Sequence, residues 1–377
     1  MKKLIRAVGL MAWAGTSTLA FAADAPTPLA QLNFATVDSS LDTLYTRPAP
    51  VQRGQQQLRN ADAAPVPIKE FAFDGDPKTY FGSLKNPTAK DDFTLVFDKP
   101  VTIKSITATT GKPDGTDKLD AGVIQLSADG TTFTDAGKFA EGVATIKGKG
   151  EKVLAVRIKP SADMTHPLAI SEIAIESDPA VMTFKYPVEI FLNYDDAPEL
   201  KDWCEKCAKI CERQYYMLNE ELKSEGYKPA TVITMTLKAR DNGVAETSGN
   251  RITGTVSFFK AHPTDFGAMV HETTHVVQHY RGRNPGWLVE GLCDYVRFFK
   301  YEPGKIGGIN PATAKYTGSY RVTARFLNYI VEKYDKEAVH KLNKMMREGT
   351  YKEEAFKDMS GKTLPELGEE WQATLKK

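Results

Sequence analysis

The sequence predicts a two-domain protein in which an all-β sandwich or barrel is followed by an α+β domain. The 377 residues exceed the length of one average domain. Residues 67–178 contain short segments in which apolar and polar residues alternate, separated by turn sequences, as in a sandwich. After residue 179, short apolar segments come first, and long segments with apolar residues three and four apart follow them. Strands followed by helices indicate an α+β domain.

The first 22 residues predict a secretory signal peptide. Lys2, Lys3 and Arg6 precede an apolar run over residues 7–14, and Ala20-Phe21-Ala22 supplies the small-x-small pattern that signal peptidase cleaves. A permanent membrane helix needs about 20 apolar residues, so an uncleaved anchor is the weaker alternative. No later segment is long and apolar enough to cross a membrane. We therefore expect an exported, soluble mature chain, periplasmic or extracellular, with no membrane partner.

The charge balance and the histidine distribution narrow the class of protein further. The chain has 49 Lys and Arg against 48 Asp and Glu, which excludes a strongly basic, phosphate-binding surface and predicts no nucleic-acid partner. Four cysteines are too few for a disulfide-stapled small domain. Four of the six histidines fall within residues 262–279, and this cluster is the one unusual feature of the composition.

The N-terminal part of the mature chain divides into a linker and a β domain. Residues 23–66 are rich in Ala, Pro, Gln and Asp with weak periodicity, which predicts a linker. Residues 67–178 form the predicted sandwich. Its expected strands are 93–97, 101–106, 122–127, 153–158 and 170–175.

Three stretches of this region resemble the discoidin, or F5/8 type C, family: FDGDPKTYF at 73–81, LSADGTTF at 126–133 and ISEIAI at 170–175. The resemblance implies a jelly-roll sandwich whose loops bind carbohydrate or another surface ligand. Some members hold a structural Ca²⁺, and the matching positions here are Asp76 and Glu172. Carboxylates in turns also stabilise the turn itself, so a role without metal is the alternative.

A second domain is predicted over residues 179–377. Its expected strands are 188–192, 232–237 and 252–259, and its expected helices are 197–224, 266–280, 287–299, 321–334 and 337–347.

The chemistry of the second domain is concentrated in an H-E-x-x-H string, His271 to His275. On a helix, residues four apart share a face, so both imidazoles can reach one cation. Neutral imidazole is a good ligand for Zn²⁺, and Glu272 can reach a water on that cation without being a ligand. An apolar helix with two satisfied core histidines is the alternative. A buried helix that carries these three polar groups requires partners for them.

A second predicted helix supplies two carboxylates. Glu290 and Asp294 are four apart and share one face among apolar residues. This arrangement predicts Glu290 as the third metal ligand and Asp294 as the acceptor of a hydrogen bond from a ligand histidine. Asp294 as the ligand, with Glu290 assisting, is the alternative. The spacing of H-E-x-x-H and E-x-x-x-D is that of gluzincins. A metzincin is excluded because Gln278 and Arg281 stand where that motif requires glycine and histidine.

Residues of about 182–375 resemble the plant basic secretory protein family and its bacterial relatives. The resemblance rests on HETTHVVQ at 271–278, PGWLVEGLCDYVR at 285–297 and SYRVTARFL at 319–327. It implies a secreted, zincin-like metallopeptidase. The near-neutral charge of this chain departs from the family's name.

These ligands predict a mechanism for peptide hydrolysis. Zinc lowers the pKa of its water, Glu272 acts as general base, and a further donor stabilises the oxyanion. Tyr320 is the predicted donor, with Tyr316 and Arg321 as alternatives and a packed core aromatic as the structural alternative. The segment 252–259 is expected to be the edge strand that pairs with substrate.

The remaining histidines and the cysteines receive weaker assignments. We expect His279 at the surface or beside a ligand, and His262 in a loop. Three cysteines, Cys204, Cys207 and Cys211, share a helix face. One of them could bridge to Cys293 in an oxidising compartment, and buried free thiols are the alternative.

Two main functions are compatible with these features, and a protease inhibitor or scaffold is a weaker third. The first is a secreted zinc endopeptidase that acts on protein or glycoprotein, with a sandwich domain that binds glycan. The second is a non-catalytic carbohydrate-binding or adhesion protein with an inactive zincin domain. The intact Glu272 favours the first, because a decayed site has no need of its base.

Overall fold

The computed structural model describes residues 31–45, 65–280 and 282–376. The predicted signal peptide and most of the predicted linker lie outside these residues. No helix in the described part of the chain is both long enough and apolar enough to cross a bilayer.

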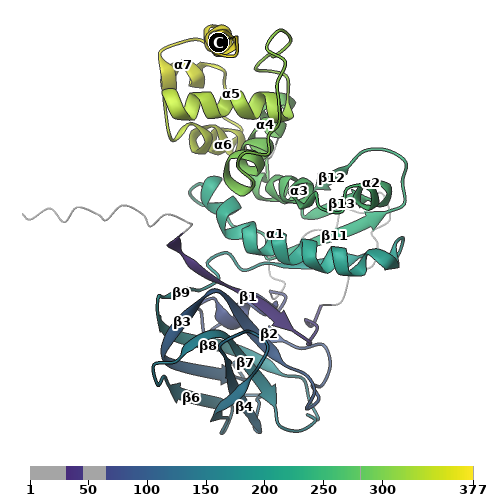
Figure 1. The fold of residues 1–377 in the computed structure, drawn as a ribbon, viewed down its shortest axis with the longest axis vertical. Coiled ribbons are helices and arrows are strands. Elements are labelled where there is room, and N and C mark those ends of the chain that lie inside the picture. The colour runs from purple at the N-terminus through teal and green to yellow at the C-terminus, as the bar shows by residue number, and fades with distance from the viewer. Residues whose placement is uncertain (1–30, 46–64, 281, 377) are drawn as a thin grey trace, which may run out of the picture. The chain divides into compact units, whose positions relative to one another are not determined.

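The N-terminal domain is a largely antiparallel β-sandwich (Figure 1). Its strands are β1 (Asn33–Ser39), β2 (Phe81–Gly82), β3 (Phe93–Thr110), β4 (Gly122–Ser127), β5 (Thr134–Lys138), β6 (Val143–Lys147), β7 (Lys152–Pro160), β8 (Ala169–Asp178) and β9 (Val181–Met182). A short 3₁₀ helix, η2, spans Lys69–Phe73. The predicted sandwich is therefore present.

The long strand β3 joins the two layers of the sandwich. Its first half pairs with β1 and β7, and its second half pairs with β6 and β8. The register with β7 shifts between Val96 and Val101, where two separate strands were expected. Alternate residues of β3, among them Phe93, Leu95 and Ile106, are fully buried, which is the period-2 pattern of a strand with one core face.

Strand β1 lies inside the stretch expected to be a linker, and here the structure differs from the prediction. Ala35 to Ser39 pair antiparallel with Phe93 to Phe97 of β3. Phe34 and Ala35 are buried. The segment is short and its pairing partner is about 60 residues away in sequence, so its own composition gave little sign of the strand.

The C-terminal domain is a mixed α/β domain built on a four-stranded sheet (Figure 1). The sheet contains β10 (Glu189–Asn193), β11 (Val232–Lys238), β12 (Ala245–Ser248) and β13 (Arg251–Thr255), in the order β10-β11-β13-β12. β10, β11 and β13 are parallel, and β12 is an antiparallel edge strand. Helix α1 (Lys201–Glu221), which follows η3 (Pro198–Leu200), connects β10 to β11 as a crossover.

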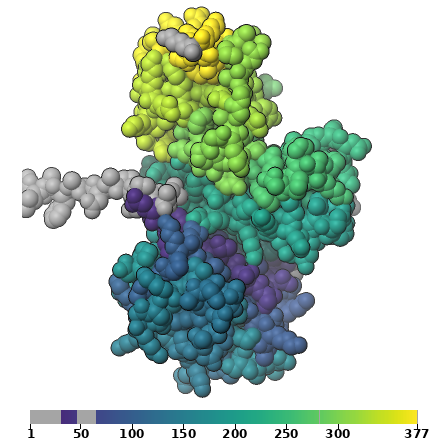
Figure 2. Space-filling view, in the orientation of Figure 1, coloured from purple at the N-terminus to yellow at the C-terminus, as the bar shows by residue number. Residues whose placement is uncertain are grey.

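The helices of this domain include the five that the sequence analysis predicted and three that it did not, which are α2, α7 and α8. They are α2 (Val256–Ala261), α3 (Phe266–Gln278), α4 (Gly286–Val296), a π-helical turn η4 (Arg297–Tyr301), α5 (Tyr320–Lys333), α6 (Ala338–Glu348), α7 (Glu354–Ser360) and α8 (Leu364–Thr374). Figure 2 shows the side chains of the last four helices, coloured light green to yellow, packed into one lobe. Phe326, Phe356 and Trp371 form the aromatic contacts inside it.

The single strand expected over 252–259 is wrong in its second half. β13 ends at Thr255, and Val256–Ala261 forms α2. Val256 and Phe259 are buried three residues apart, which is helical spacing. A short apolar run cannot be assigned to strand or helix from periodicity alone. β12, which the sequence analysis did not identify, takes the edge position instead.

Candidate metal centre

Helix α3 carries the H-E-x-x-H string through the interior of the domain. Its N-terminus is capped by Asp265, whose carboxylate accepts a hydrogen bond from the N–H of Ala268 at 3.1 Å. Its C-terminus ends at His279 in the left-handed conformation. His271 and Glu272 are buried, and His275 is half-buried. The predicted helix and the shared face of its two histidines are both present.

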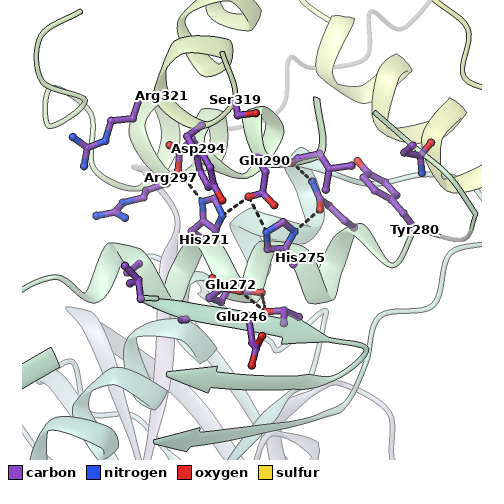
Figure 3. Close-up of a pocket in the computed structure, with 18 of the residues that line it drawn as sticks. Glu246, His271, Glu272, His275, Tyr280, Glu290, Asp294, Arg297, Ser319 and Arg321 are labelled. Carbon is purple, nitrogen blue, oxygen red and sulfur yellow. Dashed lines mark hydrogen bonds and ion pairs between the residues drawn. The ribbon is translucent and has the colours of Figure 1, made fainter. Parts of the chain in front are cut away.

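The Nδ1 atoms of the two histidines are bonded to acceptors on the protein. Nδ1 of His271 lies 2.7 Å from Oδ1 of Asp294, and Nδ1 of His275 lies 2.8 Å from Oε1 of Gln278 (Figure 3). The amide nitrogen of Gln278 donates to the carbonyl oxygen of Val289 at 2.9 Å, which fixes this side chain between α3 and α4. Such bonds hold the imidazole rings in place and leave the Nε2 atoms as the ligating atoms.

The two Nε2 atoms converge on the carboxylate of Glu290. Its Oε2 atom lies 3.2 Å from Nε2 of His271 and 3.4 Å from Nε2 of His275. Ligand atoms of a tetrahedral zinc ion stand about 3.3 Å apart when each metal–ligand distance is about 2.0–2.1 Å. The two distances from the Glu290 carboxylate to the histidines are close to this value.

A second grouping around the same histidines includes a thiol. One ligand atom from each of His271, His275 and Cys293 lies within 4.8 Å of the others, and this is the only such group among the residues that the structure describes. The sulfur of Cys293 is 3.3 Å from Nδ1 of His275, on the edge of the ring that also faces Gln278. His271 and His275 thus form a candidate metal site, with Glu290 and Cys293 as two candidates for the third ligand.

The ionisation of these groups follows from their contacts. Burial lowers the pKa of His271, but its hydrogen bonds to Asp294 and Glu290 outweigh burial and raise this pKa to about 9. Burial alone would raise the pKa of Glu290, and the two histidines instead lower it to about 2. Burial raises the pKa of the Cys293 thiol to about 11. Glu290 is therefore an anion at neutral pH, whereas Cys293 is a neutral thiol.

A residue of strand β12 fixes the side chain of Glu272, which lies on α3. The hydroxyl of Thr247 donates to the Glu272 carboxylate at 2.7 Å and lies 3.1 Å from its carbonyl oxygen. The sequence analysis missed Thr247 together with its strand. The signal was the segment ETSGNRIT at 246–253, in which a Gly-Asn pair joins two strands.

These groups line one cleft with a volume of about 1330 Å³. Its walls come from β12, from α3 and α4, and from the first turn of α5, where Tyr320 lies. The ring of Tyr320 is 6.0 Å from that of His271, centroid to centroid, and its side chain is 55% exposed. Tyr316 packs instead against Trp287 and Phe326 and does not line the cleft.

The backbone before and at Tyr320 adopts an uncommon conformation. Ser319 and Tyr320 have φ values of +60° and +46°, in the region that favours glycine. Burial raises the pKa of the Tyr320 hydroxyl, and the negative charges of Glu290 and Glu272 raise it further. The hydroxyl therefore stays protonated at neutral pH and can donate a hydrogen bond into the cleft.

His262, His279 and the cysteines other than Cys293 do not belong to the metal grouping. His279 caps α3, with its ring 6.2 Å from that of Tyr227, and His262 is exposed and stacked on Phe258. All four cysteines are buried free thiols, so the structure agrees with that alternative and contains no bridge to Cys293.

Metal-dependent hydrolases include mixed α/β domains in which two histidines with metal-ligand spacing lie beside a buried carboxylate, as they do here. Residues 188–371 match the family described as BSP, peptidase of plants and bacteria. This part of the chain belongs to that peptidase family. The expected resemblance of the C-terminal domain is thus confirmed.

Solved structures similar to this chain include carbohydrate-binding modules from Clostridium perfringens. One is CBM32-1 from a family 31 glycoside hydrolase, with 22% identity, 30% of this chain and 86% of that chain covered, and a TM-score of 0.27. Another is a CBM32 module in complex with GalNAc-β-1,3-galactose, with 13% identity, 37% and 94% covered, and a TM-score of 0.29. No curated protein matches the chain.

The predicted calcium positions lie together in the sandwich but form no compact ligand group. Glu172 accepts a hydrogen bond from the N–H of Gly75 at 3.0 Å, and Asp74 accepts one from the N–H of Asp76 at 2.9 Å. Burial and the negative charge of Asp74 raise the pKa of Glu172 to about 7. Among the described residues, only His271, His275 and Cys293 bring three metal-ligating atoms within 4.8 Å of one another. The Ca²⁺ site stays a prediction.

Proposed function

We propose that the C-terminal domain is a zinc-dependent peptidase in which His271, His275 and Glu290 hold the metal. The observation that carries this proposal is the convergence of both Nε2 atoms on Oε2 of Glu290, at 3.2 and 3.4 Å. Nδ1 of His275 is engaged by Gln278, and the sulfur of Cys293 lies 3.3 Å from this same Nδ1 atom, on that side of the ring. Cys293 therefore supports the position of His275, and Glu290 is the third ligand.

The residues of the cleft have distinct roles in this proposal. Zn²⁺, when bound, lowers the pKa of a coordinated water and polarises a carbonyl group. Glu272, held by Thr247, accepts the proton of the attacking water and passes it to the leaving amine. The hydroxyl of Tyr320 donates to the carbonyl oxygen as negative charge develops on it. Asp294 keeps the ring of His271 in place.

Strand β12 offers a place for the substrate backbone. It is an edge strand, and its residues line the cleft beside Glu272. An extended peptide can add to such an edge through backbone hydrogen bonds. This arrangement favours cleavage within a chain over recognition of an N-terminal amine, as in an endopeptidase.

The remaining parts of the proposal concern where the enzyme acts. The signal-like residues 1–22 support export to the periplasm or the exterior. The discoidin-like stretches of the sandwich support binding of a glycan or glycoprotein that holds the peptidase near its substrate. A glycan array probed with the purified chain tests this second role, and absence of binding would contradict it.

The test of the enzymatic role combines metal analysis with cleavage. Purified wild-type protein should contain about one zinc per chain and cleave members of a peptide library. Glu272→Gln should keep the metal and lose activity by about 10²–10⁴-fold. Glu205→Gln removes the same charge from the exposed surface of α1 and serves as the matched control. Bound zinc with no cleavage by wild type would favour the non-catalytic alternative.

A further inference from the structure

Arg321 presents an unpaired positive charge in the cleft. It lies in the first turn of α5, is exposed and lines the cleft. Its guanidinium carbon lies 4.7 Å from the ring centroid of the buried Phe298, and this cation–π contact holds the guanidinium group against the ring. No described residue forms an ion pair or a hydrogen bond with it.

The neighbouring arginine of the cleft differs in this respect. Arg297 donates to Asp265 at 2.5 Å and to Glu302 at 2.6 Å, so two carboxylates already neutralise its charge. Asp294 and Glu290 face the two histidines of the metal centre. Arg321 is thus the one cleft-lining cation among the described residues that has no carboxylate of its own.

The start of α5 adds to the preference for an anion at this wall. The N–H groups of Tyr320 and Arg321 donate no hydrogen bond within the described residues. Residues 318–322, which include this first turn, line the cleft. The α5 helix is 14 residues long, and free N–H groups at a helix N-terminus favour negative charge.

The direction of β12 decides which end of a substrate reaches Arg321. In Figure 3 the strand that carries Glu246 points toward the side of His275 and Tyr280, and away from Arg321. Antiparallel pairing is the more stable kind for an added strand. A peptide paired in this way runs in the opposite direction to β12. Its residues C-terminal to the scissile bond therefore lie on the side of Arg321.

From this geometry we propose that Arg321 binds a carboxylate of the substrate on the C-terminal side of the scissile bond. The carboxylate is either an acidic side chain or the C-terminus of the chain, because both offer two oxygens to one guanidinium. The proposal rests on the proposed peptidase function and deepens it. It makes the enzyme selective for acidic peptides or for sites near a free chain end.

The test compares matched peptides built on a sequence that wild type cleaves and Glu272→Gln does not. One pair carries Glu or Gln just after the scissile bond, and a second pair ends in a carboxylate or an amide. We expect wild type to show a kcat/KM that is about 10–100-fold higher for the carboxylate member of one pair. The pair that responds identifies the source of the carboxylate.

Variants of α5 then assign the preference to one side chain. In Arg321→Gln the ratio of kcat/KM between the carboxylate peptide and its neutral partner should fall toward one. Arg321→Glu should invert this ratio, and Arg321→Lys should keep part of the preference. Arg325→Gln is the matched control, because Arg325 lies one turn further along α5, bonds to the carbonyl of Gly307 and does not line the cleft. Its ratio should stay that of wild type.

The outcomes separate this inference from the proposed function. If cleavage depends on Glu272 but wild type shows a kcat/KM ratio near one for both peptide pairs, the inference is overturned and the proposed peptidase function stands. The same conclusion follows if Arg321→Gln keeps the wild-type ratio. If wild type cleaves no peptide, the proposed function fails, and calorimetry of the same peptide pairs tests the site by binding. Tighter binding of the carboxylate member that Arg321→Gln abolishes supports the site, and equal binding overturns it.

Discussion

Nδ1 of His271, on α3, lies 2.7 Å from Oδ1 of Asp294, on α4, and both side chains are buried. This bond joins the helix of the H-E-x-x-H string to the helix that supplies Glu290. It also directs Nε2 of His271 toward the position that a metal would occupy. This contact supports the proposed role of Asp294 as a positioning residue and favours it over the alternative in which Asp294 replaces Glu290 as ligand.

Asp294→Asn should weaken zinc binding by about 10–100-fold, because an amide holds the imidazole less firmly and lowers its basicity. Competition with a chromophoric chelator measures the affinity. Asp202→Asn, in the first turn of α1, is a control that removes the same charge away from the centre. An unchanged affinity in Asp294→Asn would show that this bond does not tune the site.

The third ligand can be identified by comparing Glu290→Gln with Cys293→Ser. We expect the first variant to lose zinc affinity by at least about 100-fold and the second to stay close to wild type, because Glu290 faces both Nε2 atoms. Cobalt substitution gives an independent signal, since a thiolate ligand produces a charge-transfer band in the near ultraviolet. Such a band in wild type would identify Cys293 as the ligand.

Tyr320→Phe should lower kcat by about 10²–10³-fold with little change in KM, because the hydroxyl acts on charge that develops only in the transition state. Zinc content should be that of wild type. Tyr316→Phe is the matched control, as its ring packs against Trp287 and Phe326 outside the cleft. If both variants keep full kcat, another group stabilises the oxyanion.

Gly291 allows α4 and α5 to approach closely. A Cβ atom on Gly291 would lie 2.1 Å from Cγ2 and 2.6 Å from Cβ of Thr323. Gly291→Ala should therefore destabilise the domain by about 1–3 kcal/mol and separate Glu290 from Tyr320, reducing activity. Thermal unfolding and kcat/KM measure both effects. Gly286→Ala, in the same helix, meets no atom within 4 Å and should leave stability near wild type.

Glu172 makes the stability of the sandwich depend on pH. Its pKa is raised from 4.5 to about 7 by burial and by Asp74, so the folded domain binds the proton more tightly than the unfolded chain. Stability should therefore fall as the pH rises from about 4.5 to about 7 and then stay level. Glu172→Gln should remove this dependence and raise the melting temperature at pH 8, as differential scanning calorimetry would show.

Two comparisons complete that measurement. Glu176→Gln, exposed on the same strand, should keep the pH dependence of wild type. If Ca²⁺ binds here, adding it at pH 8 should stabilise wild type and have no effect on Glu172→Gln. A melting temperature that rises between pH 5 and pH 7 in wild type and not in Glu172→Gln would contradict the assignment to this carboxylate.

Local patterns were sufficient for most of the fold. The alternating segments of the sandwich and the periodic helices α1, α3, α5 and α6 lie close to where they were expected. The elements that were not predicted include β1, whose partner strand is about 60 residues away in the sequence, the short segments β12 and α2, and the C-terminal helices α7 and α8. Such segments bury little apolar surface by themselves, so their own residues do not decide between strand, helix and loop.

The sequence by itself determined the composition of the centre. His271 and His275 are four residues apart on α3, and Glu290 and Asp294 are four apart on α4. Helix geometry alone therefore places the two members of each pair on one face of their helix. Only the tertiary structure decided which atoms meet. The packing of α3 against α4 turns both Nε2 atoms toward Glu290, brings Gln278 and Cys293 to His275, and sets Thr247 against Glu272. It also leaves Arg321 in the cleft without a carboxylate partner, a property that depends on where distant side chains lie.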